Sequence, residues 1–403
     1  MQGKVFEEIT DSMSRIIEYT GLEVEIMKTN ISDLYDRAAA IVDLGRISHN
    51  LEVVKQKAPG KKVIAMVKAN AYGHGIVRVS EHLIAEGADY LGVAFVEEGV
   101  MLREAGITAP ILVTGAFLKP HIKEYLLHNI DITVSSITAL EEVEEVARAL
   151  GKRARIHLQI DTGMMRVGVR DTSAPQLLEA ASLSGVCDVI SVFSHFATAD
   201  GADLEFANLQ LERFMEAIHF YEKHDIKRPM VHIANSAGIL RLPESHLDAV
   251  RPGIMLYGYH PSEFTENEAQ LEPALSLRAK ITYFKVILEG TSVGYGRTWV
   301  SDEDTRAVTL LIGYGDGYLR GFSNKSEVLI HGRRYPVVGN ISMDHTVVSL
   351  GKDGEGYRGD EAVLIGTQGG DTITATELAA KLGTINYEIL TGIGSRVPRI
   401  YIN

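Results

Sequence analysis

Several polar side chains in this chain stand where short apolar runs of the sequence end. Lys68 follows the run VIAMV, His195 closes the run VISVFSH, and Arg251 lies in the run VRPGI. A lysine at the end of one strand is usually only a solvated strand end, but several such residues at neighbouring strand ends indicate a shared site. The polar residues in these positions are Lys68, Arg166, His195, Asn235, Ser236 and Arg251, with Gly253 beside the last of them.

These residue types suit the chemistry of an aldehyde cofactor. A lysine that emerges from a buried strand is desolvated, which lowers its pKa and makes the amine a nucleophile able to form a Schiff base. Ser236 and the peptide units of Gly253 and Ile254 offer the hydroxyl and N–H groups that anchor a phosphate. His195, although such a histidine is more often a core residue, could lie over an aromatic ring, and Arg251 could face a ring nitrogen. Together these parts fit pyridoxal 5'-phosphate.

The elements that must position these residues alternate between strands and helices. From residue 62 to about residue 258, eight short β-branched, apolar runs alternate with amphipathic stretches of helical length, such as residues 140–150 and 204–223. Strands that read as continuous apolar runs are usually buried on both faces. The pattern predicts an α/β fold with an N-terminal (β/α)8 barrel, whose reactive groups lie at the carboxyl ends of the strands. An open doubly wound sheet is the alternative.

The character of the sequence changes after about Glu268. Alternating strands and tight turns replace the long helices, and turn signals recur about every 8–12 residues, as in antiparallel sheets. We therefore expect an N-terminal extension over residues 1–35, the barrel over residues 36–268 and a mostly-β C-terminal domain over residues 269–403. Residues 40–44, before the first barrel helix, are expected to pair with the β domain.

Composition narrows the function classes. Lys and Arg number 40 against 53 Asp and Glu among 403 residues, and the net charge of -13 disfavours a general nucleic-acid binder. The apolar runs are strand-sized, whereas a membrane helix needs roughly 20 apolar residues. The acidic, polar N-terminus differs from a signal peptide, and Cys187 alone can form no intrachain disulfide. We therefore expect a cytoplasmic protein that binds neither nucleic acid nor membranes.

One stretch, VIAMVKANAYGHG, resembles the pyridoxal-phosphate attachment site of alanine racemases. The resemblance continues, in the family's order and spacing, through DTGMMRVG, SHFATAD, HIANSAGIL, RPGIMLYG, SVGYGRTW, LLIGYGDGYLR, NISMDH, INYEI and RVPRIY. It covers nearly all of the chain after about Ala40. It implies an isomerase that interconverts L-alanine and D-alanine with pyridoxal 5'-phosphate and supplies D-alanine for the peptidoglycan of the cell wall.

The resemblance also implies roles for individual residues. Lys68 would carry the cofactor and act as one catalytic base, and Tyr295 would act as the second base from the partner subunit of a homodimer. Arg166 and the backbone of Met343 would bind the substrate carboxylate. The implied cofactor contacts are Lys68, Tyr72, Arg166, His195, Asn235, Ser236, Arg251, Gly253, Ile254 and Tyr387. Taken alone, tyrosines flanked by glycines, as in GYG, are more often turn residues.

Two opposed bases suit a racemisation. The reaction removes a proton from one face of the α-carbon and returns it to the other, which a single base could do only by swinging across the plane. Lys68 would therefore serve one enantiomer and Tyr295 the other, with the pKa of the tyrosine, about 10 when free, lowered by a neighbouring cation. Because Arg251 cannot give a proton to the pyridine nitrogen, the cofactor would be a weaker electron sink with fewer side reactions.

The chain departs from the family pattern at two positions. Many members carry a carbamylated lysine two residues before Asp161, where this chain has Gln159. Another device must therefore position Arg166, for example an amide hydrogen bond or a bound anion. The second arginine of the channel gate is Asn340 here, which removes a charge. The channel residues implied by the resemblance are Asp200, Tyr314, Arg320, Asn340 and Ile385. Tyr387 is typical of alanine specificity.

Three alternatives stand beside this interpretation. Gln159 and Asn340 leave room for a broader or serine-leaning amino-acid racemase. Pyridoxal-phosphate decarboxylases of similar design use a C-terminal cysteine motif and an acidic partner for the ring nitrogen, whereas this chain has Cys187 in the barrel and Arg251. A non-catalytic carrier of the cofactor would resemble the barrel alone, and the β domain with Tyr295 argues against it.

Overall fold

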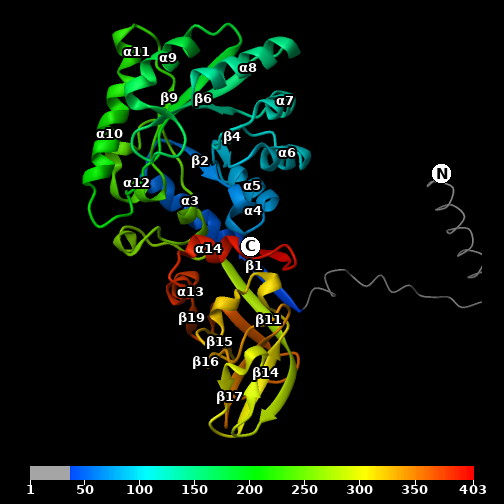
Figure 1. Ribbon diagram of the computed structural model, residues 1–403. Coiled ribbons are helices and arrows are strands. Elements are labelled where there is room, and N and C mark those ends of the chain that lie inside the picture. Colours follow the sequence, from blue (N-terminus) through cyan, green and yellow to red (C-terminus); the bar gives the residue numbers. More distant parts are fainter. Residues whose placement is uncertain (1–36) are drawn as a thin grey trace, which may run out of the picture. The chain divides into compact units, whose positions relative to one another are not determined.

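The computed structural model describes residues 37–403, so the predicted N-terminal extension over residues 1–35 lies outside the described residues. Within them, eight parallel strands form the centre of the region in the upper part of Figure 1. These strands are β2 (Lys62–Met66), β3 (Tyr90–Val93), β4 (Ile111–Val113), β5 (Ile132–Val134), β6 (Ala154–Asp161), β8 (Cys187–Phe193), β9 (Met230–His232) and β10 (Ala249–Val250). The short β7 (Val169–Arg170) pairs with the end of β6.

Hydrogen bonds join these strands into a closed ring. β10 pairs with β2, β2 with β3 and β3 with β4, and β5, β6, β8 and β9 pair in the same parallel manner. A bridge between Leu112 and Asp131 joins β4 to β5, and the bond from Asp248 N to Val231 O joins β10 to β9. The predicted (β/α)8 barrel is therefore confirmed, and the open doubly wound sheet is excluded.

Helices cover the outside of the ring (Figure 1). α8 (Ile137–Leu150) confirms a predicted helix: its apolar residues recur on one buried face, the Ser136 hydroxyl accepts a hydrogen bond from Ala139 N, and Gly151 ends it in a left-handed conformation. The helix predicted over residues 204–223 is divided into α10 (Glu205–Ile218) and α11 (Phe220–Lys223). The other barrel helices are α3 (Leu44–Lys57), α5 (Ile76–Ala85), α6 (Val96–Glu104), α7 (Ile122–Leu127), α9 (Ala174–Ser182) and α12 (Ser236–Arg241).

The C-terminal part of the chain consists mainly of antiparallel strands, as predicted, with two short helices. These elements are β11 (Leu275–Ile287), β12 (Ser292–Val293), β13 (Trp299–Val300), β14 (Thr305–Leu310), β15 (Glu327–Ile330), β16 (Arg333–Pro336), β17 (Thr346–Gly351), β18 (Glu361–Gln368), β19 (Asp371–Ile373), α13 (Ala375–Leu382), α14 (Asn386–Thr391) and β20 (Arg399–Ile402). β1 (Ala38–Asp43) lies between β11, to which it is antiparallel, and β20, to which it is parallel. The segment before the first barrel helix therefore belongs to the β domain, as its sequence suggested.

No helix in residues 37–403 is long and apolar enough to cross a membrane. Nor do these residues include a cluster of three or more His, Cys, Asp or Glu side chains that could hold a metal ion. Cys187 is a buried free thiol at the start of β8.

Candidate active site

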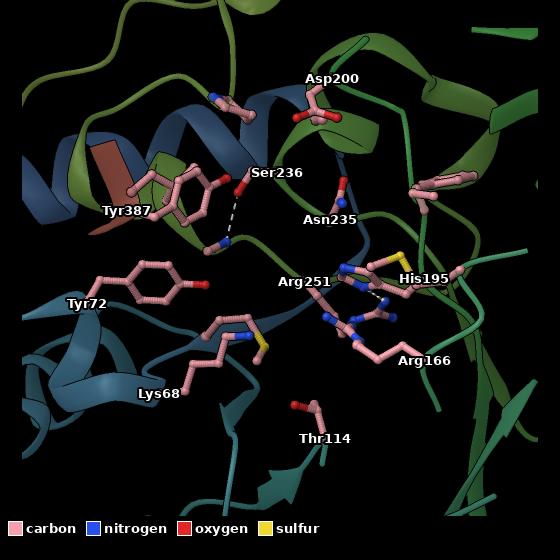
Figure 2. Close-up of a pocket in the computed structure, with 18 of the residues that line it drawn as sticks. Lys68, Tyr72, Thr114, Arg166, His195, Asp200, Asn235, Ser236, Arg251 and Tyr387 are labelled. Carbon is pink, nitrogen blue, oxygen red and sulfur yellow. Dashed lines mark hydrogen bonds between the residues drawn. The ribbon is translucent and has the colours of Figure 1, made fainter. Parts of the chain in front are cut away.

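A cavity of about 400 Å³ opens at the carboxyl ends of the barrel strands (Figure 2). Every residue predicted to contact the cofactor lines this cavity, as does the predicted channel residue Asp200: Lys68, Tyr72, Arg166, His195, Asn235, Ser236, Arg251, Gly253, Ile254 and Tyr387. Parallel strands of a barrel all point their carboxyl ends to one face, so residues distant in sequence meet there. The structure brings these side chains together, and their individual roles stay predictions.

Lys68 lies two residues after the end of β2, at the start of the short turn α4 (Lys68–Tyr72), and its side chain reaches into the cavity (Figure 2). Burial lowers the pKa of its amine and the positive charge of Arg166 lowers it further, while Glu98 opposes them. A larger share of this amine is therefore uncharged at neutral pH than in a solvated lysine. An uncharged amine is the form that attacks an aldehyde.

The turn after Lys68 has a left-handed backbone. Its φ angles are 53° at Ala69, 56° at Asn70, 53° at Ala71 and 51° at Tyr72. This conformation costs roughly 1–2 kcal/mol per L-residue. Contacts with neighbouring segments hold the turn: Ala69 N donates a hydrogen bond of 2.6 Å to Glu98 Oε1, and Arg399 Nε donates one of 2.9 Å to Gly73 O. The strained turn directs both Lys68 and the tyrosine that ends it toward the cavity.

Ser236 and Gly253 form a polar corner with two tyrosines. Ser236 Oγ accepts hydrogen bonds from Gly253 N (2.9 Å) and Met255 N (3.4 Å), which leaves its own hydrogen to donate. A Cβ on Gly253 would lie 2.5 Å from Tyr72 Oη, so glycine is what allows the tyrosine to approach. The ring of Tyr72 lies 6.0 Å from that of Tyr387, and burial raises the pKa of both phenols. The corner thus presents protonated hydroxyls that suit an anion such as a phosphate.

Arg251 is buried beneath the cavity and held by the barrel backbone. Its Nη2 donates to Ser194 O at 2.6 Å and to Ile233 O at 3.1 Å, and lies 3.3 Å from His195 Nδ1. Burial, with a contribution from Arg166, lowers the pKa of Arg251 to about 9, so it is charged at neutral pH. Burial and the charge of Arg251 hold the pKa of His195 far below its ordinary value, so this ring is neutral. A neutral imidazole can stack on a flat aromatic ligand.

Gln159 lines the same cavity as Arg166. Its Oε1 is buried and has no hydrogen-bond partner among residues 37–403. The carboxylate of Asp161 accepts hydrogen bonds from Gly163 N at 2.8 Å and Met165 N at 3.1 Å, so Asp161 orders the backbone of the loop that carries Arg166. The Gln159 oxygen is therefore an acceptor at the cavity wall that a guanidinium or a bound ligand can use.

The remaining predicted residues lie outside this cavity, on loops of the C-terminal domain. They are Tyr295, Tyr314, Arg320, Asn340, Met343 and Ile385. The side chain of Tyr295 is 74% exposed and that of Met343 51% exposed. Backbone hydrogen bonds from Tyr314 N to Ser342 O (3.0 Å) and from Gly315 N to Met343 O (2.9 Å) hold two of these loops side by side. Within one chain, the predicted second base therefore does not line the cavity that holds Lys68.

Some residues that line the cavity were not among the predicted site residues. Thr114 follows the run PILV and points toward the cavity in Figure 2. It stands at a strand end, as Lys68 does, so the same signal could have identified it. Met164 and Phe193 also line the cavity, but nothing in their residue types indicated a site.

Family models match almost the whole described chain. The model described as "Alanine racemase, N-terminal domain" matches residues 42–261, and that described as "Alanine racemase, C-terminal domain" matches residues 274–401. The chain is similar to an alanine racemase of Carboxydothermus hydrogenoformans, with 44% identity over 90% of this chain and 99% of the relative. It is also similar to alanine racemase 2 of Bacillus subtilis, with 42% identity over 90% of this chain and 93% of the relative.

Solved structures of the same kind share the fold. An alanine racemase of Clostridium difficile 630 superposes with a TM-score of 0.86 and 35% identity, covering 91% of this chain and 96% of that one. An alanine racemase of Bartonella henselae with covalently bound pyridoxal phosphate superposes with a TM-score of 0.82 and 28% identity, covering 91% and 99% of the two chains.

Proposed function

Because this chain belongs to the alanine racemase family, we propose that it interconverts L-alanine and D-alanine with pyridoxal 5'-phosphate attached to Lys68. The observation that carries this proposal is the cavity at the barrel mouth. It collects a desolvated lysine, a hydroxyl-lined corner and a buried arginine within about 400 Å³.

The residues of this cavity fit the cofactor. The amine of Lys68 has a lowered pKa, as attack on an aldehyde requires. Because Gly253 has no Cβ, the Tyr72 hydroxyl can lie close to it, near the Ser236 hydroxyl that accepts a hydrogen bond from Gly253 N. This polar corner suits a phosphate. Neutral His195 would pack on the pyridine ring and Arg251 would donate a hydrogen bond to its nitrogen. Bound there, the cofactor makes the α-hydrogen of an attached amino acid acidic.

The chain's own residues would then move one proton. Lys68 Nζ would hold or release it on one face of the substrate α-carbon, and the phenol of Tyr295 would do so on the other. Arg166 and the backbone N–H of Met343 would orient the substrate carboxylate. Arg251 would keep its proton at neutral pH and so would not protonate the pyridine nitrogen of the cofactor. An unprotonated ring withdraws fewer electrons, which would favour return of the proton to the substrate over side reactions.

The active site would be shared between two copies of the chain. Tyr295, Met343 and Tyr314 are exposed on loops of the C-terminal domain, away from the chain's own Lys68. In a two-fold dimer each copy would offer these loops to the cavity of its partner. Asp200 at the cavity, with Arg320, Asn340 and Ile385 on the loops, would then border the channel through which alanine enters.

The biological role follows from this reaction. The product D-alanine would serve peptidoglycan synthesis, and the lone Cys187 agrees with work in the reducing cytoplasm. Because Gln159 and Asn340 depart from the family pattern, the second candidate function is a racemase that accepts several amino acids or prefers serine. Initial rates with alanine, serine and lysine distinguish the two, and equal rates with lysine would overturn the alanine assignment.

The proposal is tested on the purified full-length protein. We expect visible absorbance from the bound cofactor, and borohydride reduction should fix it to Lys68, as peptide mapping by mass spectrometry would show. The same preparation should convert L-alanine to a mixture of enantiomers. A preparation that stays colourless and inert after the cofactor is added would refute the proposal.

A further inference from the structure

A chain of hydrogen bonds runs through the inside of the barrel to Arg251. Asp131 Oδ2 lies 3.0 Å from His157 Nε2, and His157 Nδ1 lies 2.5 Å from Ser191 Oγ. Ser191 Oγ lies 2.9 Å from His232 Nε2, and His232 Nδ1 lies 2.5 Å from Arg251 Nη1. All of these side chains are buried, and the most exposed, Arg251, is only 4% exposed. We call these residues the relay.

The two ends of the relay determine the direction of every hydrogen bond in it. A guanidinium only donates and an ionised carboxylate only accepts. Arg251 therefore donates to His232 Nδ1, so that His232 carries its proton on Nε2 and donates to Ser191 Oγ. Ser191 in turn donates to His157 Nδ1, and the proton on His157 Nε2 is donated to Asp131. In this order every donor faces an acceptor.

The charges at both ends support this order. Burial opposes ionisation of Asp131, but the hydrogen bond from His157 and the ion pair with Arg155 outweigh it and hold the pKa of Asp131 below its ordinary value. Arg155 Nε lies 2.8 Å from Asp131 Oδ1. At the other end, burial and the charge of Arg251 hold the pKa of His232 far below its ordinary value. A neutral His232 has the lone pair on Nδ1 that Arg251 needs.

Arg251 keeps one donor for a ligand. Its Nη1 is engaged by Nδ1 and by the backbone oxygen of His232, and its Nη2 by Ser194 O and Ile233 O. Within the described part of the chain, no residue accepts a hydrogen bond from its Nε. The barrel therefore holds both Nη groups and leaves the Nε–H for an acceptor in the cavity.

We infer that Asp131 is a positioning residue for Arg251. Its negative charge orders the protons of the relay, so that the last histidine presents a lone pair to the guanidinium and fixes it. The proposed function enters only in naming the ligand: the acceptor would be the pyridine nitrogen of the cofactor. Asp131 touches neither cofactor nor substrate in this arrangement and acts through the four residues between it and the cavity, Arg251 included.

Replacing the carboxylate by an amide should reverse the relay. In Asp131→Asn the amide oxygen is the group that Arg155 can pair with, which turns the NH₂ toward His157 Nε2. His157 must then carry its proton on Nδ1 and donate to Ser191, and Ser191 must donate to His232 Nε2. The proton of His232 moves to Nδ1, where it meets the N–H of Arg251. Two donors face each other, and the guanidinium is displaced.

Neutron diffraction from deuterated crystals of the full-length protein reads these protons directly, with and without pyridoxal 5'-phosphate. In the wild type we expect deuterium on Nε2 of both His157 and His232 and none on their Nδ1 atoms. In Asp131→Asn we expect deuterium on Nδ1 of both rings and a displaced Arg251. Deuterium on Nδ1 of His232 in the wild type would overturn the inference, whether or not the protein racemises alanine.

Kinetics supply the second measurement. Asp131→Asn should lower kcat about tenfold, as the loss of a supporting hydrogen-bond partner commonly does, with KM for alanine changed less than about threefold. Ser191→Ala interrupts the relay but leaves Asp131 and Arg155 paired, and it should also lower kcat. This second variant keeps the inference testable if Asp131→Asn does not fold. Thr133→Val is the matched control, because this buried barrel hydroxyl donates to Val113 O at 2.6 Å and not to a residue of the relay. Equal kcat values for Ser191→Ala and Thr133→Val would contradict the inference.

Discussion

The side-chain amide of Asn340 donates a hydrogen bond of 2.7 Å to the backbone carbonyl of Tyr295. Two loops of the C-terminal domain are thereby tied together, and the residue tied is the proposed second base. The position where the family resemblance implies a channel arginine thus holds a loop in place through a neutral hydrogen bond. This relationship makes Asn340 a support for the Tyr295 loop, besides its proposed place in the channel.

Asn340→Asp should weaken that support. A carboxylate has no N–H to donate and would face the Tyr295 carbonyl with negative charge. A net hydrogen bond contributes about 1 kcal/mol, so we expect kcat for alanine to fall about fivefold. Asn129→Asp on the barrel surface is the control and should leave kcat unchanged. Equal kcat values for the two variants would show that the hydrogen bond of Asn340 does not support the action of Tyr295.

Tyr295→Phe should keep the cofactor and lose the reaction. The phenol is the proposed acceptor on one face of the substrate, so removal of its oxygen should cost most in one direction of racemisation. The visible absorbance of the bound cofactor should stay as in the wild type. Tyr283→Phe, at another exposed tyrosine of the C-terminal domain, is the matched control. Full activity of Tyr295→Phe in both directions would refute the two-base assignment.

Mixing two inactive variants should restore activity if the site is shared. Lys68→Ala and Tyr295→Phe subunits, unfolded together and refolded, would form mixed dimers in which one site has both groups and the other has neither. With random pairing, about half of the dimers are mixed, and about a quarter of wild-type activity should return. No recovery beyond the separately refolded variants would place both groups in the same chain.

Attachment of the cofactor should follow the pKa of Lys68. Burial and then Arg166 lower that pKa from the ordinary 10.5, so the reactive neutral amine accumulates as pH rises through a value below 10.5. The rate of attachment to the cofactor-free protein, followed by absorbance against pH, should therefore rise at lower pH than in Arg166→Gln. An identical profile for the two proteins would show that the arginine does not act on this amine.

Gly253→Ala should expel or displace Tyr72. The new Cβ would lie 2.5 Å from the Tyr72 hydroxyl, and relief of such overpacking costs about 1–3 kcal/mol. We expect the affinity for pyridoxal 5'-phosphate to fall about tenfold or more, measured by absorbance titration of the cofactor-free protein. Gly185→Ala, where a Cβ meets no atom within 4 Å, is the control. Unchanged affinity would mean that Tyr72 does not border the phosphate.

The sequence predicted that residues at the strand ends would gather at one mouth of the barrel, and the structure places them around one cavity. Lys68, His195 and Arg251 stand at or just after apolar runs, and a barrel turns all such positions toward one mouth. Local sequence is enough here because the direction of a strand follows from its order along the chain. The lowered pKa of Lys68 was predictable for the same reason, since a residue leaving a buried strand loses water.

Other features depended on which residues meet across the fold. His157 and His232 lie inside apolar runs, and only the register of neighbouring strands places Ser191 within 2.5 Å and 2.9 Å of their rings. The left-handed turn after Lys68 opposes the intrinsic preference of its residues, so contacts from distant segments must hold it.

The sequence by itself therefore determined the barrel, the second domain and the reactive groups at the strand ends, because residue type and local periodicity specify them. Only the tertiary structure decided that Tyr295 is exposed outside the cavity of Lys68, that Asn340 ties its loop, and that Asp131 connects to Arg251. Distances of a few ångströms between segments far apart in the chain arise from packing and strand register, which no short stretch of sequence encodes.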